Sequence, residues 1–341
     1  MRLVAERIAL LGSSDLDTRA RSLTVAIPSF NRRAQVVELV QGLGPQLRSA
    51  EGDVRVMVGL DGSTDGSREA LEGAGIGVPL EIIDLPHHGA ARCRNALLDR
   101  CETELIWFLD DDMIPAPRLL AAHRDAHDSG ERKVVIGPCE IPRTAYTLGF
   151  LREYWRSLND RLAAEGRVTA FDSFRVANAS APVEVFREVG GLDGSLPGHS
   201  YEDYDLGLRL IEAGIPIVFE PSAVAHHHQI RSLSESCDHR REAGANLVRF
   251  ARRHPDRVEE VVERVALPAH VIRIVEVTRR NPQTLNRIST VVATGDTVLS
   301  RVLGRGSGRL RRTAHMTALS AGIAQLGGHA LLDNLIDRSR S

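Results

Sequence analysis

Short apolar runs alternate with stretches of helical periodicity from residue 23 onward. The apolar runs are rich in aliphatic and β-branched residues, which is typical of buried strands. They cover residues 23–28, 54–60, 79–85, 104–109 and 133–137. Helical periodicity fills the intervals, at residues 32–43, 65–72, 90–100 and 118–128. This alternation predicts βαβ units and a mostly parallel central sheet flanked by helices, which is an α/β fold.

The later part of the chain follows a different pattern. Helices are expected at residues 148–164 and 204–213, and a short strand at residues 216–220 follows the second helix. From about residue 231 the sequence is mainly helical and rich in arginine. The pattern therefore predicts an α/β part followed by a helical C-terminal extension.

The balance of charge bears on the partners of the chain. The 341 residues include 26% charged residues and carry a formal net charge of -2. Nucleic-acid-binding domains commonly carry a basic excess on one face, so we expect no nucleic-acid partner. Lys133 is the only lysine, and arginine, whose planar guanidinium suits phosphate, supplies nearly all the positive charge.

The cysteines and the apolar segments bear on the cellular compartment. The four cysteines form no C-x-x-C pair, so the signature of a zinc ribbon is lacking and free thiols in a reducing cytoplasm are expected. Glu6 and Arg7 interrupt the apolar N-terminal run, which argues against a signal peptide. No uninterrupted apolar stretch reaches the roughly 18–20 residues of a membrane helix. We expect a cytoplasmic protein, with peripheral contact to a membrane left open.

Three consecutive carboxylates, Asp110, Asp111 and Asp112, directly follow the apolar run at residues 104–109. In parallel sheets ligands bind beyond the carboxyl ends of the strands. Adjacent carboxylates repel one another, and a hard divalent cation such as Mg²⁺ or Mn²⁺ relieves that repulsion. The sequence favours a metal site here over the alternative, a solvated acidic turn.

Two further strand ends carry polar residues. Asp61 follows the run at residues 54–60, and a turn with Thr64 or Asp65 as helix cap is expected beside it. Arg94 lies in the first turns of a helix that begins after Gly89, where a helix N-terminus and arginine together suit an anion. A capped helix with solvated arginine is an equally good interpretation of the second feature.

The acidic pair Glu202 and Asp203 precedes the helix at residues 204–213. One of them could act as a general base, although an acidic helix N-terminus explains both without a function. His226, His227 and His228 follow the last predicted strand. Neighbouring residues of a strand point to opposite faces, so we expect one of the three, or His226 with His228, to face the site.

In their order along the chain, these motifs resemble those of the inverting family 2 glycosyltransferases, which have the GT-A fold. The resemblance spans about residues 23–228 and rests on five segments. These are I-P-S-F-N-R at residues 27–32, D-G-S-T-D at 61–65, R-N at 94–95, D-D-D at 110–112, and G-G-L-D at 190–193 with E-D-Y-D at 202–205.

The resemblance implies roles for single residues. Asp203 would be the catalytic base, with Glu202 beside it. The metal ion, Mn²⁺ or Mg²⁺, would be bound by Asp112, His226 and Asp110. The residues implied to bind the nucleotide-sugar are Pro28, Ser29, Asn31, Arg32, Asp61, Arg94, Asp110 and Asp111. On the acceptor side we consider Tyr154, Trp155 and Asn178, although core packing is the stronger interpretation for the two aromatic residues.

The resemblance also implies an organisation and a reaction. A lead segment at residues 1–22 would precede a GT-A catalytic domain at 23–230, with a nucleotide half at about 23–115 and an acceptor half at about 116–230. A mainly helical extension would follow at 231–341, available for a membrane surface or a homo-oligomer. The domain would transfer a sugar from a nucleotide-diphosphate sugar, in this family usually a UDP-sugar, to a glycan, lipid carrier, natural product or peptide.

The sequence departs from the family at some positions, and three other functions compete with this interpretation. Leu60 stands where the family often has a second aspartate, and the Q-x-x-R-W motif of processive synthases is absent. A nucleotidyltransferase would usually have a glycine- and lysine-rich loop after the first strand, where this chain has P-S-F-N-R. A non-catalytic scaffold would have no need of Asp112 and Asp203. A Rossmann dehydrogenase is excluded by the lack of G-x-G-x-x-G after the first strand.

Overall fold

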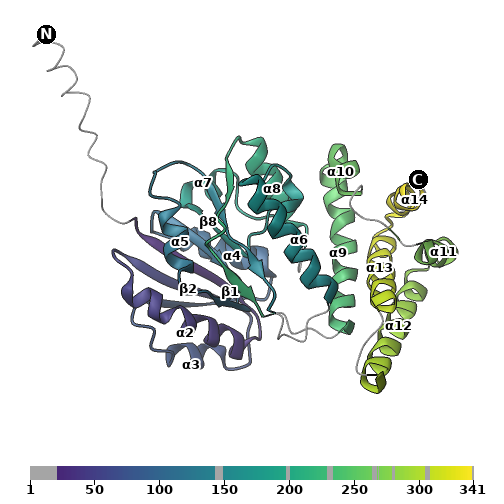
Figure 1. Cartoon of the computed structure of the whole chain (residues 1–341), viewed down its shortest axis with the longest axis horizontal. Helices are drawn as coiled ribbons and strands as arrows, with labels where there is room; N and C mark the ends of the chain where they lie inside the picture. The colour runs from purple at the N-terminus through teal and green to yellow at the C-terminus, as the bar shows by residue number, and fades with distance from the viewer. Residues whose placement is uncertain are drawn as a thin grey trace, which may run out of the picture.

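The computed structural model describes residues 21–142, 149–196, 200–228, 233–262, 267, 269–278, 281–303 and 308–339. Most of the lead segment at residues 1–22 lies outside this range. Figure 1 shows an α/β part built on a central sheet and a group of C-terminal helices beside it. No helix in the described ranges is both long and apolar enough to cross a membrane.

The central sheet has seven strands in the order β3-β2-β1-β4-β8-β6-β9. Strands β1 to β4 are parallel to one another, and β8 runs antiparallel between β4 and β6. The bounds of the strands are Leu23–Ser29 (β1), Val54–Asp61 (β2), Leu80–Leu85 (β3), Leu105–Leu109 (β4), Val134–Ile136 (β6), Asn178–Pro182 (β8) and Ile217–Phe219 (β9). The mostly parallel sheet expected from the sequence is confirmed, and β8 is a strand that the apolar pattern did not predict.

Helices cover both faces of this sheet. Residues of β1 alternate between them: Val25 and Ile27 pack against Leu39 on one face, and Ala26 packs with Phe108 on the other. The helices of the α/β part are Arg33–Ser49 (α2), Ser67–Glu72 (α3), Ala90–Arg100 (α4), Leu119–Asp125 (α5), Gly149–Glu165 (α6), Val183–Glu188 (α7) and Glu202–Glu212 (α8).

A second, smaller sheet lies at the carboxyl end of β4. It has three strands in the order β5-β10-β7, with bounds Met113–Pro115 (β5), Ala225–His227 (β10) and Cys139–Glu140 (β7). Strand β5 begins directly after Asp112, and β10 pairs with it antiparallel. This pairing brings the segment that contains His227 close to the aspartates that follow β4.

The C-terminal part is helical, as the sequence predicts, and stands beside α8 in Figure 1. Its helices are Leu233–Arg253 (α9), Val258–Val262 (α10), Ala269–Thr278 (α11), Pro282–Leu303 (α12), Gly308–Gln325 (α13) and His329–Arg338 (α14). Helices α9 and α13 cross closely, since a Cβ atom added at Gly322 would lie 1.8 Å from the carbonyl oxygen of Arg241. The extension packs on the α/β part through Phe250, which contacts Phe171 and Tyr201.

A buried chain of polar side chains joins β4, α5 and β8. Asn178 Oδ1 accepts hydrogen bonds from Trp107 Nε1 (3.0 Å) and His123 Nε2 (2.8 Å). Because His123 Nε2 carries the proton, its Nδ1 accepts from the Ser180 hydroxyl (2.8 Å), and His127 Nε2 then donates to that same hydroxyl oxygen (2.9 Å). Both imidazoles are thus neutral, and burial lowers the pKa of His123 to about 4 and that of His127 to about 3.

These two histidines should make the fold labile to acid. Their pKa values are lower in the folded chain than the ordinary 6.5, so the unfolded chain takes up protons first as the pH falls. The neutral histidines therefore contribute fully to the free energy of unfolding above about pH 6.5. This contribution decreases as the pH falls toward 4, and by pH 5 about 2 kcal/mol per histidine is lost. Urea unfolding of wild type and His127→Gln from pH 7 to pH 5 measures this, and the variant should show the weaker pH dependence. His329→Gln, which changes an exposed histidine, is the control. If the free energy of unfolding of His127→Gln depended on pH as strongly as that of wild type, His127 would not be a source of the acid lability.

Candidate functional site

The carboxyl ends of β1 and β4 hold a buried acidic cluster. Ser29 Oγ donates to Asp111 Oδ2 at 2.8 Å. A single nitrogen of Arg32, Nη1, donates to Asp111 Oδ1 (2.8 Å) and to Asp112 Oδ2 (2.9 Å). Both aspartates are buried, whereas the Arg32 side chain is partly exposed.

This cluster carries more negative than positive charge. Burial raises the pKa of Asp111 to about 6; Arg32 lowers it, and repulsion from Asp112 raises it further. An acidic group whose ionised form is disfavoured by neighbouring carboxylates is the setting in which a divalent cation binds. The residues after β4 are therefore suited in charge to a cation with oxygen ligands.

His227 is the histidine that lies beside these aspartates. Its Nε2 is 3.0 Å from Asp112 Oδ1, and both side chains are buried. The backbone N–H of His228 donates to the carbonyl oxygen of Asp112 at 2.7 Å. His226 points elsewhere, with Nδ1 3.6 Å from Glu140 and 37% of its side chain exposed. The choice of His226 as the site histidine thus needs correction, because alternation along β10 turns it away and turns His227 inward.

A metal at this position would take only part of its ligands from the chain. Among the described residues, no three His, Cys, Asp or Glu side chains converge closely enough to form a metal site by themselves. Asp112 and His227 offer one oxygen and one nitrogen side by side. Mg²⁺ and Mn²⁺ commonly bind through one or two protein ligands together with water and substrate phosphates, so this pair fits such an ion.

Asp61 organises the turn that precedes α4. Its carboxylate accepts from the backbone N–H groups of His88 (2.8 Å) and Gly89 (2.9 Å) and from Nδ1 of His87 (3.0 Å). The His87 ring stacks on Phe30, with ring centroids 4.0 Å apart. Phe30 is exposed at the end of β1, so this pair presents an aromatic surface beside the acidic cluster.

Two residues of the first turn have mainly structural contacts. Asn31 Oδ1 accepts from the backbone N–H of Thr64, and the Asn31 N–H donates to Ser63 Oγ, which ties the turns after β1 and β2 together. Asn31 has a φ of 50°, a left-handed conformation that asparagine tolerates better than most residues. Pro28 is buried within β1 opposite Gly59.

Arg94 connects the acidic cluster to the second half of the α/β part. Its Nη2 lies 2.5 Å from Asp110 Oδ1, and it also interacts electrostatically with Asp203 and Glu202. The guanidinium is buried, and its Nε and Nη1 atoms have no hydrogen-bond partner among the described residues. Arg94 thus forms an ion pair with Asp110 and is near enough to the Glu202–Asp203 pair to interact with it electrostatically.

Glu202 and Asp203 form the first turn of α8, where Glu202 is buried and Asp203 is half-buried. Burial raises the pKa of Glu202 to about 8 and Asp203 raises it further, while Arg94 lowers it. Burial also raises the pKa of Asp203, although Arg94 and Arg175 lower it. Burial thus disfavours the ionised form of both carboxyl groups, so a base in this pair would have a pKa above the ordinary carboxyl range. One Asp203 oxygen accepts from the backbone N–H of Val176 at 3.3 Å.

Two aromatic residues of α6 lie near the site. The edge of Trp155 faces His227 with ring centroids 5.7 Å apart, and Trp155 is half-buried. Tyr154 is 44% exposed, and its hydroxyl accepts a hydrogen bond from Arg175. Arg175 also lies over the ring of Tyr204 and was not recognised from the sequence, where one more arginine carries no distinguishing signal.

Asn178 does not belong to the acceptor side. It is buried in β8, and besides its two bonds from Trp107 and His123 its Nδ2 donates to the carbonyl oxygen of Ala223 at 2.9 Å. Its polar atoms are thus engaged inside the protein, and the sequence-based expectation that it contacts an acceptor is wrong.

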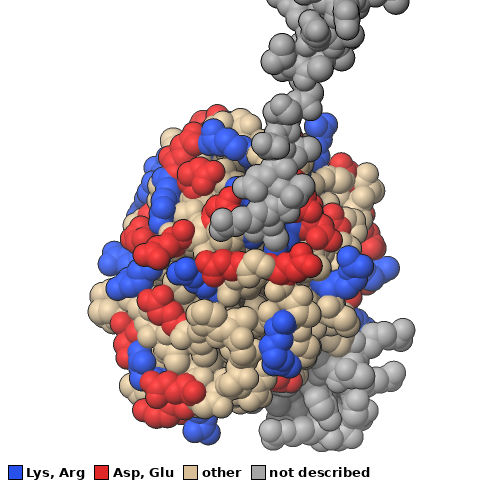
Figure 2. All heavy atoms as spheres, turned by 90° about the vertical axis from the view of Figure 1, so that its left-hand side faces the viewer, with Lys and Arg blue, Asp and Glu red and all other residues tan. Residues whose placement is uncertain are grey.

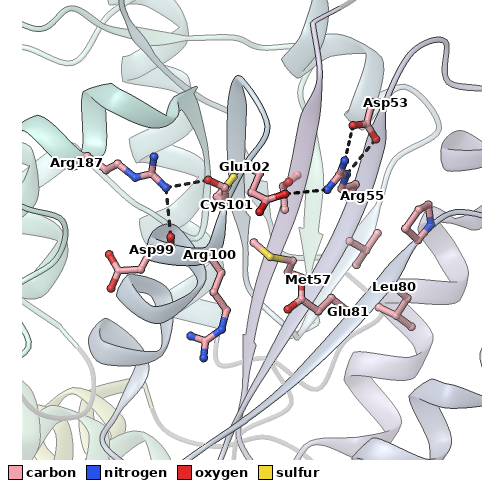
Figure 3. Close-up of a pocket in the computed structure, with 13 residues that line it drawn as sticks. Asp53, Arg55, Met57, Leu80, Glu81, Asp99, Arg100, Cys101, Glu102 and Arg187 are labelled. Atoms are coloured by element: carbon pink, nitrogen blue, oxygen red, sulfur yellow. Dashed lines mark hydrogen bonds and ion pairs between the residues drawn. The ribbon is translucent and has the colours of Figure 1, made fainter.

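A separate hollow lies at the opposite, amino-terminal ends of the parallel strands (Figure 3). Two of its arginines are engaged within the protein: Arg55 contacts Asp53 and Glu102, and Arg187 donates to the backbone carbonyl oxygens of Asp99 and Cys101. Ligands of parallel sheets bind at the carboxyl ends of the strands, so this hollow is not the candidate site. Figure 2 shows the face of the α/β part opposite the C-terminal helices, where basic and acidic residues are interspersed.

Comparison with known proteins bears on both the fold and the site. The sequence model described as glycosyl transferase family 2 matches residues 24–181. The pre-mycofactocin glycosyltransferase of Mycobacterium tuberculosis is 30% identical over 252 residues, which cover 71% of this chain and 50% of that protein. The validoxylamine A glucosyltransferase of Streptomyces hygroscopicus subsp. jinggangensis is 27% identical over 277 residues, which cover 70% of this chain and 62% of that protein. The chain therefore spans about half to three-fifths of the length of these relatives.

Solved structures show the same fold at low sequence identity. The mannosyltransferase PcManGT of Pyrobaculum calidifontis, in complex with GDP-Man and Mn²⁺, superposes with a TM-score of 0.57 at 17% identity and covers 92% of this chain and 89% of its own. Residues 1–349 of S. aureus TarS give a TM-score of 0.51 at 16% identity and cover 94% and 90%.

Proposed function

The chain belongs to the family 2 glycosyltransferases and has the GT-A fold, and from this premise we propose that it transfers a sugar from a nucleotide-diphosphate sugar to an acceptor with inversion at the anomeric carbon. The observation that carries the proposal is the arrangement of two carboxylate groups about Arg94. One is the Asp110–Asp112 cluster with His227, and the other is the Glu202–Asp203 pair.

The first group is suited to the donor. Asp112 and His227 would hold Mn²⁺ or Mg²⁺, and the bound ion would neutralise charge on the departing diphosphate. Arg32 reaches Asp111 and Asp112 from the turn after β1, where its guanidinium is also in place to contact a phosphate. The Phe30–His87 pair offers an aromatic surface for the base, with a UDP-sugar as the first donor to test.

The second group is suited to the acceptor. Asp203, in its deprotonated form, would take the proton from an acceptor hydroxyl, thiol or amine. The acceptor atom then forms a bond to the anomeric carbon while the bond from that carbon to the diphosphate oxygen breaks on the opposite face. The nucleoside diphosphate leaves with the bonding electron pair, and one displacement inverts the configuration. Trp155, which lies against His227, and Tyr154 beside it would contact the acceptor.

Calorimetric titration of UDP, GDP and dTDP, each with and without Mn²⁺, tests the donor site. We expect one nucleotide to bind in a metal-dependent manner, and Asp112→Ala to abolish the metal dependence because it removes an oxygen ligand. His227→Ala should weaken binding in the same way, whereas His226→Ala should not, because His226 faces Glu140.

Glu140→Gln serves as the control, since this carboxylate is exposed and lies beside His226. Folded protein that binds none of the three nucleotides would contradict the donor site and favour a non-catalytic scaffold. Binding of a nucleoside triphosphate in preference to the diphosphates would favour a nucleotidyltransferase.

A further inference from the structure

The backbone directly before Glu202 is held in an unfavourable conformation. Ser200 and Tyr201 both have left-handed φ angles, 80° and 71°, and neither is glycine. For a residue with a side chain this region is sparsely populated, and such residues persist where the surrounding structure enforces them. The two residues lead straight into the carboxylate pair, so their conformation sets where Glu202 and Asp203 point.

The C-terminal helix α9 makes contacts that enforce this conformation at Ser200 and Tyr201, directly before the carboxylate pair. Asn246 of α9 is fully buried, and its Nδ2 donates to the carbonyl oxygen of Ser200 at 3.1 Å. Its Oδ1 in turn accepts from Arg249 at 2.7 Å, which fixes the orientation of the amide. Phe250, one turn further along α9, packs against the buried ring of Tyr201 with centroids 5.9 Å apart.

The end of the same helix also holds Asp205, which follows the carboxylate pair in sequence. Asp205 is fully buried, and its Oδ1 lies 2.9 Å from Nε2 of His254, the residue that follows α9. Its Oδ2 receives Nε and Nη2 of Arg209 from its own helix. Contacts from α9 and His254 thus bracket the segment at residues 200–205, and the carboxylate pair lies between the two points of attachment.

We propose that α9 is a positioning element of the active site: Asn246 stabilises the left-handed turn at Ser200 and Tyr201 and thereby directs Glu202 and Asp203 toward the acceptor. This inference rests on the proposed function, in which Asp203 is the base. It gives the C-terminal extension a role in turnover that requires neither a membrane nor a second subunit. Asn246 acts through the backbone of Ser200 and does not itself contact the reacting atoms.

The test combines Asn246→Ala with Ser200→Gly. Glycine adopts a left-handed φ without steric cost, so it should remove the need for the Asn246 contact. Asn246→Ala alone should lower kcat about tenfold, the effect of one lost, partly buried hydrogen bond, and leave KM for the nucleotide-sugar within about twofold. In the double variant, kcat should return to within about threefold of wild type. Release of nucleoside diphosphate from UDP-glucose and GDP-mannose, with water as acceptor, measures turnover.

Amide hydrogen exchange of the segment at residues 200–208 gives a second measurement that needs no activity. Exchange there should accelerate in Asn246→Ala and slow again in the double variant. Arg252→Ala is the control, since Arg252 also projects from α9 but donates to the carbonyl oxygen of Leu326, and both readouts should stay near wild type.

Two results would overturn the inference: wild-type exchange and turnover in Asn246→Ala, or a double variant that is no better than Asn246→Ala. A wild-type protein without turnover on either nucleotide-sugar would instead count against the proposed function. The exchange data would still show whether Asn246 stabilises the turn at Ser200 and Tyr201.

Discussion

Asp203→Asn is expected to lower turnover by about 10²–10⁴-fold, the usual contribution of a general base. Asparagine keeps the size of the side chain and the hydrogen bond from the Val176 N–H, but it cannot take up a proton. Binding of the nucleotide should remain, because Asp203 belongs to α8 and not to the Asp110–Asp112 cluster that follows β4. Turnover is measured as release of nucleoside diphosphate, and binding by calorimetry.

The pH profile provides a further check on the same residue. A base acts in its deprotonated form, so kcat/KM of wild type should fall as the pH falls through the pKa of Asp203. Burial raises that pKa, so the acid limb should lie above the ordinary carboxyl range. Asp160→Asn, on the exposed side of α6, is the control and should keep wild-type kinetics. An Asp203→Asn protein with more than a tenth of wild-type turnover would show that another group is the base.

Asn178→Leu is expected to lower the free energy of unfolding by about 3–5 kcal/mol. Leucine is similar in size but leaves the Trp107 indole N–H, the His123 Nε2–H and the Ala223 carbonyl without their partner. Each buried group without a partner costs about 1–3 kcal/mol, and neighbouring losses do not add fully. Urea unfolding at pH 7 gives the difference directly.

Asn159→Leu is the matched control, because half-buried Asn159 donates one hydrogen bond, to the carbonyl oxygen of Cys139. It should cost about 1 kcal/mol. If Asn178 contacted the acceptor instead, Asn178→Leu would unfold like wild type and show lower turnover. The two outcomes are separated by measuring stability and turnover on the same preparation.

The parallel half of the sheet could be predicted from the sequence, but β8 could not. Strands β1, β2 and β4 are mainly apolar, and β3 keeps aliphatic residues between its two acidic ones, so the hydrophobicity of all four is visible without tertiary information. Strand β8 reads Asn-Ala-Ser-Ala-Pro, a composition with low strand propensity. It is buried between β4 and β6 because small residues fit there and because Asn178 and Ser180 find partners in His123 and His127. Those partners are distant in sequence, so no local pattern reveals them.

The candidate site shows the same division. The aspartates after β4 and the Glu202–Asp203 pair were identified because their place at element ends is a local property. The histidine was misplaced by one residue, since alternation says that His226 and His227 face opposite ways but does not say which faces inward. That choice depends on the antiparallel pairing of β10 with β5, in which His227 lies opposite Met113.

The position of β8 also affects the order in which the two carboxylate groups of the site are assembled during synthesis. Strands β1 to β4 all lie within residues 23–109, whereas β8 begins at Asn178 and inserts beside β4, where Asn178 pairs with Leu109. Chains fold from the N-terminus as they emerge from the ribosome. The nascent chain is therefore expected to assemble its aspartate cluster first. The carboxylate pair can be set in place only after β8 has inserted and α9 has docked, so a chain released early from the ribosome would lack the means to transfer the sugar.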